Sequence, residues 1–287
     1  MNLYQDLDTV RSALSLGASN TDEDADILRI VEAVSREADG FCGIGGRSAV
    51  GMDGFGFFPR TESRLIELSR TSRWRELRAP KLLGLTSLKV DGAGDDTYAT
   101  SLTELTDFVL EPRSGLPKSA VRFLADSGQA FYQGSGSSLG VAEITAEWGE
   151  YSELISGGTT AEALDSSELG IDLTGGHLVT AGRTILIGTE QIYVASVSTN
   201  TATVERGVNG TTAAAHLTGA TVSIYRYPRP VEDAVLMQSL RLLARRSTSF
   251  ASVTVNPDLG QVEIFKGLDE DVKDMLRRYI DPVADFA

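Results

Sequence analysis

The residues of this chain that could do chemistry are few, and the first candidate is a serine motif. Gly136-Ser137-Ser138-Leu139-Gly140 fits G-x-S-x-G, the pattern of a nucleophile elbow, in which Ser138 would be the attacking group of a hydrolase. That elbow joins a strand to a helix, whereas this motif ends a Gly/Ser-rich stretch, residues 126–140, and precedes a predicted strand. The context favours a flexible loop over a catalytic site.

Metal chemistry has little support in the sequence. His177, His216 and Cys42 are isolated from one another and lack the spacing of zinc ligands. The run from Asp91 to Asp96 has neither the alternating ligands nor the closing Glu of a calcium loop, so it is typical of a hairpin turn. The sequence therefore predicts a protein without a metal or other cofactor, and one that is not an enzyme.

A cluster of arginines between Arg60 and Arg78 could bind phosphate. Acids interleave with it at Glu62, Glu67 and Glu76, which favours a salt-bridged face or a subunit contact. The formal net charge of the whole chain is -14, which argues against a protein that grips nucleic acid through its phosphates. An acidic wall would still let DNA slide past, because it repels phosphates.

Composition is that of an ordinary globular chain, with 41% hydrophobic and 23% charged residues among 287. A single cysteine excludes an internal disulfide. No apolar run approaches the ~20 residues of a membrane helix, and the N-terminus lacks a signal pattern. We expect a soluble, non-secreted protein.

The elements that would position these residues are read from hydrophobic periodicity. The clearest is a helix over Asp22–Phe41, whose apolar residues recur every three or four positions. Further helices are predicted over Leu3–Leu16, Val231–Arg246 and Glu270–Ile280. Alternation of period two predicts strands at Leu85–Val90, Thr106–Leu110, Val121–Leu124 and Val141–Trp148, and a hairpin is expected at Ser252–Val255 and Gln261–Phe265.

The composition shifts between Ser156 and Arg226, where Arg183 and Arg206 are almost the only basic residues. Short strands are expected there at Thr184–Ile187, Gln191–Val197, Thr201–Glu205 and Thr221–Tyr225. The predicted fold class is α+β: a helical bundle with a small antiparallel sheet and an inserted all-β domain. The predicted domains are 1–155 (N-terminal part of the core), 156–228 (the insert) and 229–287 (C-terminal part of the core).

The order of these pieces resembles the head-to-tail adaptor, or connector, proteins of tailed double-stranded-DNA bacteriophages. The resemblance rests on the helices Asp6–Arg11 and Ile27–Gly43, the phrases LLGLTSLKVDGAGDDTYAT, DFVLEP and VAEITAEWG, and the segment from Leu268 to Tyr279. The phrase RGVNGTTAAAH, residues 206–216, also resembles part of the inserts of some connector proteins.

The resemblance implies a structural virion protein in the neck between head and tail, assembled in the host cytoplasm. It would form a ring, commonly of twelve subunits, that docks on the portal protein and carries a stopper or tail-completion protein, while genomic DNA passes through its lumen without sequence-specific binding. No membrane is involved. We expect the C-terminal residues Asp281, Pro282, Val283 and Phe286 to contact the portal or a neighbour, and Phe131 and Tyr132 to lie in a subunit-interface or partner loop.

Two other functions stay open at this stage. The chain could be another neck component, a stopper or a tail-completion protein. It could also be a β-module binding protein whose insert recognises a host surface or a carbohydrate. That second alternative requires an exposed aromatic patch, and the aromatic residues between Ser156 and Arg226 are Tyr193 and Tyr225.

Overall fold

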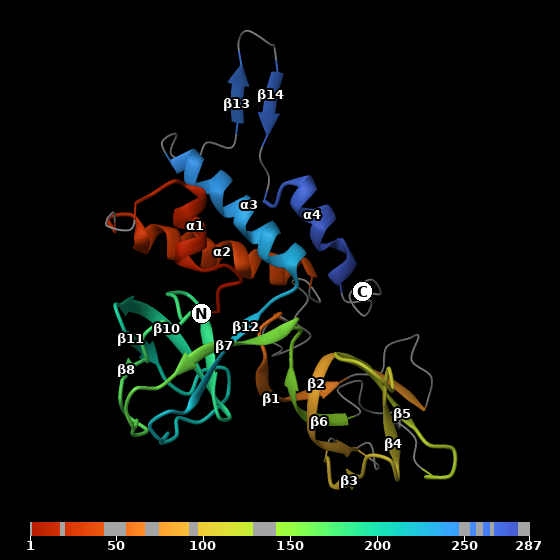
Figure 1. Cartoon of the computed structure of the whole chain (residues 1–287). Helices are drawn as coiled ribbons and strands as arrows, with labels where there is room; N and C mark the ends of the chain where they lie inside the picture. Colours follow the sequence, from red (N-terminus) through yellow and green to blue (C-terminus); the bar gives the residue numbers. More distant parts are fainter. Residues whose placement is uncertain are drawn as a thin grey trace. The chain divides into compact units, whose positions relative to one another are not determined.

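The computed structural model describes residues 2–17, 21–42, 56–66, 75–91, 97–128, 142–246, 253–256, 261–264 and 267–280 (Figure 1). The chain forms two compact units. The first is built from residues 1–45 and 151–280, and the second is centred on residues 46–150.

The helices of the first unit fall on the segments that the sequence predicted, except that residues 3–6, predicted as the start of the first helix, are not helical. They are α1 (Leu7–Ala13), α2 (Asp24–Cys42), α3 (Arg229–Arg245) and α4 (Glu270–Leu276), which continues into the short 3-10 helix η2 (Arg277–Tyr279). The predicted stripe of α2 is buried, from Ile27 to Ala38. Helix α2 packs on α3, and α3 packs on α4. The helices therefore form one layer built from both ends of the chain.

A β-barrel completes the first unit. Its strands are β7 (Glu153–Thr159), β8 (Gly170–Asp172), β9 (Thr184–Ile187), β10 (Glu190–Ser198), β11 (Thr201–Glu205) and β12 (Thr221–Arg226). They pair antiparallel in the order β7-β12-β9-β10-β11-β8. A bridge between Thr160 and Leu173 then joins the two end strands, supported by the hydrogen bond from Ala161 N to Asp172 O at 2.7 Å. The sheet is thus closed and leaves no free edge strand.

The second unit is an open antiparallel sheet. Its strands are β1 (Arg60–Ile66), β2 (Glu76–Val90), β3 (Thr100–Leu102), β4 (Phe108–Glu111), β5 (Lys118–Phe123) and β6 (Ala142–Trp148). The order is β1-β6-β2-β5-β4, with β3 also paired to β2. On β6 the residues alternate between buried and half-buried, with Ala142, Ile144, Ala146 and Trp148 in the core, as predicted. No described strand pairs with the outer edge of β1.

A two-stranded hairpin lies between α3 and α4 in the chain. Its strands are β13 (Val253–Asn256) and β14 (Gln261–Ile264), which pair antiparallel with each other and with no other described strand. The sequence predicted this hairpin.

The predicted fold class is wrong. The described residues are organised mainly by two six-stranded antiparallel sheets, and the helices form a layer on one of them rather than a bundle with a small sheet beside it. The error has a physical cause in β2, whose fifteen residues extend upstream of Leu85 through Glu76, Arg78 and Pro80, which break the apolar alternation. Strand β7 also escaped prediction, because Gly157 and Gly158 are poor strand formers.

Candidate functional site: a buried polar junction

The most heavily built polar site joins the barrel to the helices through the residues that precede α1. This N-terminal strap, residues 2–6, is almost completely buried, from Asn2 at 2% exposed to Asp6 at 7%. It runs beside residues 181–184 of the barrel, since Leu7 N donates a hydrogen bond to Ala181 O at 3.2 Å. Gly182, with a φ of +90°, allows this approach, because a Cβ there would lie 3.1 Å from Leu3.

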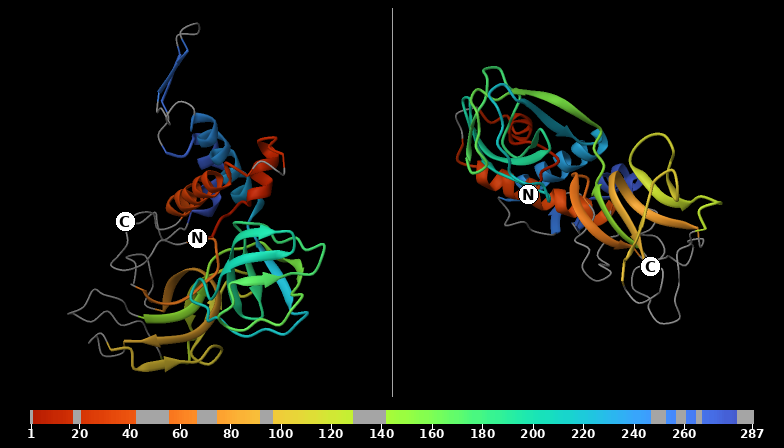
Figure 2. Two further views of the ribbon diagram at one scale, coloured as in Figure 1. Left: turned by 90° about the vertical axis from the view of Figure 1, so that its left-hand side faces the viewer. Right: turned by 90° about the horizontal axis from the view of Figure 1, so that it is seen from below.

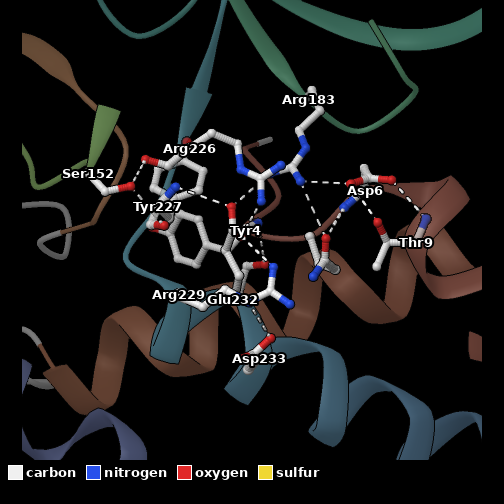
Figure 3. A network of polar contacts seen from close by, with 12 residues as sticks. Tyr4, Asp6, Thr9, Ser152, Arg183, Arg226, Tyr227, Arg229, Glu232 and Asp233 are labelled. Carbon is white, nitrogen blue, oxygen red and sulfur yellow. Dashed lines mark hydrogen bonds and ion pairs between the residues drawn. The ribbon is translucent and has the colours of Figure 1, made fainter. Parts of the chain in front are cut away.

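Arg183 of the barrel is the centre of the junction (Figure 3). Its guanidinium Nη2 lies 2.7 Å from Asp6 Oδ2 of the strap, and its Nη1 lies 3.5 Å from Glu232 Oε1 of α3. Both Arg183 and Glu232 are fully enclosed, at 3% and 1% exposed. A single guanidinium therefore pairs with the carboxylate that precedes α1 and with a carboxylate of α3.

The carboxylates of Asp6 and Glu232 also accept hydrogen bonds from groups other than Arg183. Asp6 also accepts hydrogen bonds from Thr9 N at 2.8 Å and Thr9 Oγ1 at 3.0 Å, so it caps α1. Burial acts to raise the pKa of Asp6, but Arg183 and the hydrogen bonds from Thr9 outweigh it and hold that pKa below its usual value. Glu232 Oε2 lies 2.8 Å from Arg226 Nη2 at the end of β12, and Tyr227 N donates to Glu232 Oε1 at 3.3 Å.

A tyrosine pair extends the junction to α2. The Tyr4 hydroxyl donates a short hydrogen bond to Asp39, and Arg36 Nη2 lies 3.1 Å from the other carboxylate oxygen of Asp39. The ring of Tyr4 packs on that of Tyr227 with centroids 4.5 Å apart. Burial, and then the nearby Asp39, raise the pKa of Tyr4 well above its usual value, so this phenol stays protonated.

Asn2 ties the strap to the loop after β11. Its Nδ2 donates to Asn209 Oδ1 at 2.8 Å, and Asn209 Nδ2 donates to Gln191 Oε1 of β10 at 2.7 Å. Thr184 Oγ1 of β9 donates to Asn2 Oδ1 at 2.6 Å. The strap is therefore hydrogen-bonded to three parts of the barrel.

The barrel contains a second buried ionic cluster, centred on Glu190. Arg206 binds it with two nitrogens, Nε at 2.7 Å from Oε1 and Nη2 at 2.8 Å from Oε2, and His216 Nε2 lies 2.7 Å from Oε2. Ala214 N also donates to the carboxylate, at 3.1 Å. Burial alone would raise the pKa of Glu190, but these hydrogen bonds and the charge of Arg206 lower it to about 2.

This second cluster shapes the loop that carries the phrase at residues 206–216. Arg206 also donates to the carbonyl oxygens of Asp165, Glu168 and Ala214, at 2.7 to 3.0 Å. Glu190, Arg206 and His216 are thus each bound to another part of the barrel. The arrangement fixes the loop.

The structure does not place the site residues predicted from the sequence. Asp281, Pro282, Val283 and Phe286, and likewise Phe131 and Tyr132, are outside the described residues. Ser138 of the serine motif is outside them as well.

Arg60, Arg64 and Arg78 of β1 and β2 form ion pairs, as the sequence indicated. Arg64 Nη2 lies 2.6 Å from Glu62, and Arg78 Nε lies 3.9 Å from Glu76. Arg64 also lies over the ring of buried Trp148, with its guanidinium carbon 4.6 Å from the ring centroid. Through these contacts the side chain of Arg64 is held against the sheet at its edge strand β1.

Sequence reasoning missed the junction, although two signals pointed to it. Arg183 and Arg206 are the rare basic residues of a segment nearly free of them, and the side chains of both, each 4% exposed, are paired with carboxylates. Glu232 interrupts the apolar face of α3 beside Val231 and Val235, where an acid must have a buried partner. Which residues would meet could not be read from the sequence, because Asp6 and Arg183 are far apart along it.

Comparison with known proteins identifies no relative: no family model, curated protein or solved structure matches the chain. Among the described residues, no group of three or more His, Cys, Asp or Glu side chains is placed to hold a metal ion. None of the helices described here is both long enough and apolar enough to cross a membrane.

Proposed function

We propose that this chain is a non-enzymatic structural protein of the phage neck, a head-to-tail adaptor that forms a ring on the portal and lets DNA pass through its lumen. The observation that carries the proposal is the buried junction around Arg183. It fixes the barrel, the strap and the helical layer into one block, and its charged groups are all used in holding that block together.

A rigid block of this kind suits a protein that holds two partners at a fixed distance. Its ionic groups contribute positioning rather than turnover, because Asp6, Glu232 and Glu190 each face a buried arginine and are closed off from solvent. The sequence resemblance to connector proteins supports the same function. The net charge of -14 suits a lumen that repels the phosphates of passing DNA.

The β-module alternative loses its main requirement. Recognition of a carbohydrate by a barrel surface needs exposed aromatic rings, but Tyr193 and Tyr225 are 4% and 3% exposed. The barrel, which is described throughout, therefore offers no aromatic platform from those two residues. We do not carry this alternative further.

The experiment is electron microscopy of the purified protein, alone and mixed with the portal protein encoded in the same genome. We expect rings, or an extra layer of density stacked on the portal. Images of the mixture in which the portal stays bare and the added protein stays monomeric would overturn the proposal.

A further inference from the structure

The three connections at one end of the barrel, which is green to blue-green in Figure 2, are joined to one another. Neighbouring strands of the barrel are antiparallel, so the connections β7–β8, β9–β10 and β11–β12 lie at the same end. Leu164 and His216 form a bridge between the first and third connections, and an added Cβ at Gly188 in the second would lie 3.8 Å from His216. Arg206 also binds carbonyl oxygens of the first and third. We call these connections, residues 160–169, 188–189 and 206–220, the barrel end.

Two leucines of the barrel end are exposed to solvent. Leu217 is 82% exposed and Leu169 is 59% exposed. The backbone of each is held in place, because Leu217 O accepts a hydrogen bond from Thr160 Oγ1 at 3.0 Å and Leu169 O accepts one from Val204 N at 2.9 Å. Large apolar groups gathered on one exposed surface mark a site of interaction with another molecule. The barrel end therefore has apolar groups for a partner to cover.

The barrel end is also acidic. Its arginine, Arg206, is paired with Glu190, and its remaining formal charges are the carboxylates of Glu162, Asp165 and Glu168. Each of these three residues is exposed or half-buried, and none forms an ion pair with another residue that the structure describes. A partner that complements this surface brings apolar groups together with positive charge.

The β4–β5 connection of the open sheet, residues 112–117, has these properties. Leu116 is 60% exposed, and Arg113 on the same connection is exposed. Lys118 Nζ donates hydrogen bonds to Pro112 O at 2.7 Å and to Arg113 O at 3.2 Å, so a second positive charge lies at the connection. No acidic residue occurs from Pro112 to Lys118. The connection therefore carries an exposed apolar side chain with a cation on either side of it in the sequence.

We propose that the β4–β5 connection of one copy docks on the barrel end of a second copy. Leu116 packs against Leu169 and Leu217, and the two cations of the connection face the three carboxylates. The inference rests on the proposed function, because it names the contact between neighbouring subunits of the ring. The two halves of the contact are different surfaces of one chain, which makes the contact heterologous, and heterologous contacts close into a ring where the rotation between subunits permits.

The chemistry of the barrel end favours a second copy over other occupants. Its carboxylates repel the phosphates of nucleic acids and of anionic lipids. A carbohydrate needs exposed aromatic rings, which Tyr193 and Tyr225 do not supply. The chain itself carries a connection that is both apolar and basic. Opposite charges at this contact offset part of the repulsion between copies that each have a formal charge of -14.

The test gives each surface a charge that repels the other. Leu217→Arg adds a cation to the barrel end, and Leu116→Glu adds an acid to the β4–β5 connection. The matched controls are Leu178→Arg in the β8–β9 connection, at the opposite end of the barrel, and Leu105→Glu in the β3–β4 connection, since these leucines are also exposed, at 62% and 72%. Sedimentation velocity over a range of protein concentrations measures self-association, and circular dichroism checks that each variant is folded.

We expect Leu217→Arg and Leu116→Glu each to weaken self-association by about tenfold or more, and the two controls to stay within about twofold of the unmodified protein. An equimolar mixture of Leu217→Arg and Leu116→Glu should associate again, because the intact connection of the first variant meets the intact barrel end of the second. Misfolding of either variant would not produce this recovery.

Self-association that is equally strong in all four variants, or a mixture that associates as weakly as its two components, would overturn the inference. An unmodified protein that is monomeric at every concentration would overturn it as well. If rings of both contact variants still form on the portal, the proposed function stands and only the contact is wrong. If the unmodified protein stays monomeric and leaves the portal bare, both are wrong.

Discussion

The barrel and the open sheet are each built from six antiparallel strands, but the ion pairs around Arg183 and the pair between Lys89 and Glu143 differ sharply in exposure. The barrel is closed, and the side chains of its arginines Arg183 and Arg206, each 4% exposed, are paired with carboxylates. On the open sheet, Lys89 and Glu143 form a pair at 2.8 Å with side chains 39% and 28% exposed. The pairs of Arg183 are therefore enclosed and the Lys89 pair is solvated, although the open sheet also has enclosed cations in Arg64 and Lys81, at 6% and 9% exposed.

The difference follows from desolvation. A charge that has been taken out of water depends on its partner, so removing one member of a buried pair leaves an uncompensated charge at a cost of about 3–5 kcal/mol. An exposed pair is solvated whether or not it forms, and typically contributes about 0–1 kcal/mol. The comparison can be tested by removing one member of each kind of pair.

The largest effect is expected from Glu232→Gln, which leaves Arg183 and Arg226 without the carboxylate that they share. We expect a loss of about 3–5 kcal/mol in the free energy of unfolding, measured by urea denaturation. The control is Asp233→Asn, one residue along α3, whose partner Arg229 is exposed. A loss below about 1 kcal/mol for Glu232→Gln would show that the junction is not a fastener.

The second-largest effect is expected at acid pH, where the barrel should become less stable. The pKa of Glu190 is lowered from the ordinary value of 4.5 to about 2 in the folded protein. Its carboxylate therefore stabilises the fold fully at pH values above 4.5, and this contribution is lost as the pH falls towards 2. We expect the thermal unfolding midpoint to fall across this window. In Glu190→Gln the midpoint should be lower near neutral pH and should change less with acid. An identical pH profile in the two proteins would contradict the assignment.

A smaller effect is expected where the strap meets the barrel. Gly182 has a φ of +90°, and an added Cβ would lie 3.1 Å from Leu3. Gly182→Ala should therefore cost about 1–3 kcal/mol of stability. Gly175→Ala, at a position with open space around it, is the matched control. Equal denaturation curves for the two variants would mean that the strap does not lie against this turn.

The smallest effect is expected on the open sheet. Lys89→Met removes one member of the exposed pair with Glu143, and we expect a change of no more than about 1 kcal/mol. Urea denaturation with and without 0.5 M salt, roughly five times the ionic strength at which the screening length is about 10 Å, checks this. A loss as large as that of Glu232→Gln would erase the contrast between the two regions.

Local pattern was enough to predict much of the secondary structure. The stripe of α2 and the alternation of β6 are buried as their periodicity indicated, and β9 and β11 have the predicted bounds. Closure of the barrel was beyond prediction, because it depends on a bridge between Thr160 and Leu173 that no local pattern encodes. The junction was missed for the same reason, since Tyr4 and Asp6 read as part of a helix until their partners are known.

Buried charge fastens the barrel to the strap and the helices, and a double-mutant cycle between Asp6 and Arg183 measures that attachment. Asp6→Asn and Arg183→Met would be made singly and together, and the free energy of unfolding of each protein measured in urea. We predict a coupling energy of about 1–3 kcal/mol between the two positions. Losses that add to within about 0.5 kcal/mol would show that Asp6 and Arg183 act independently, and would contradict the account.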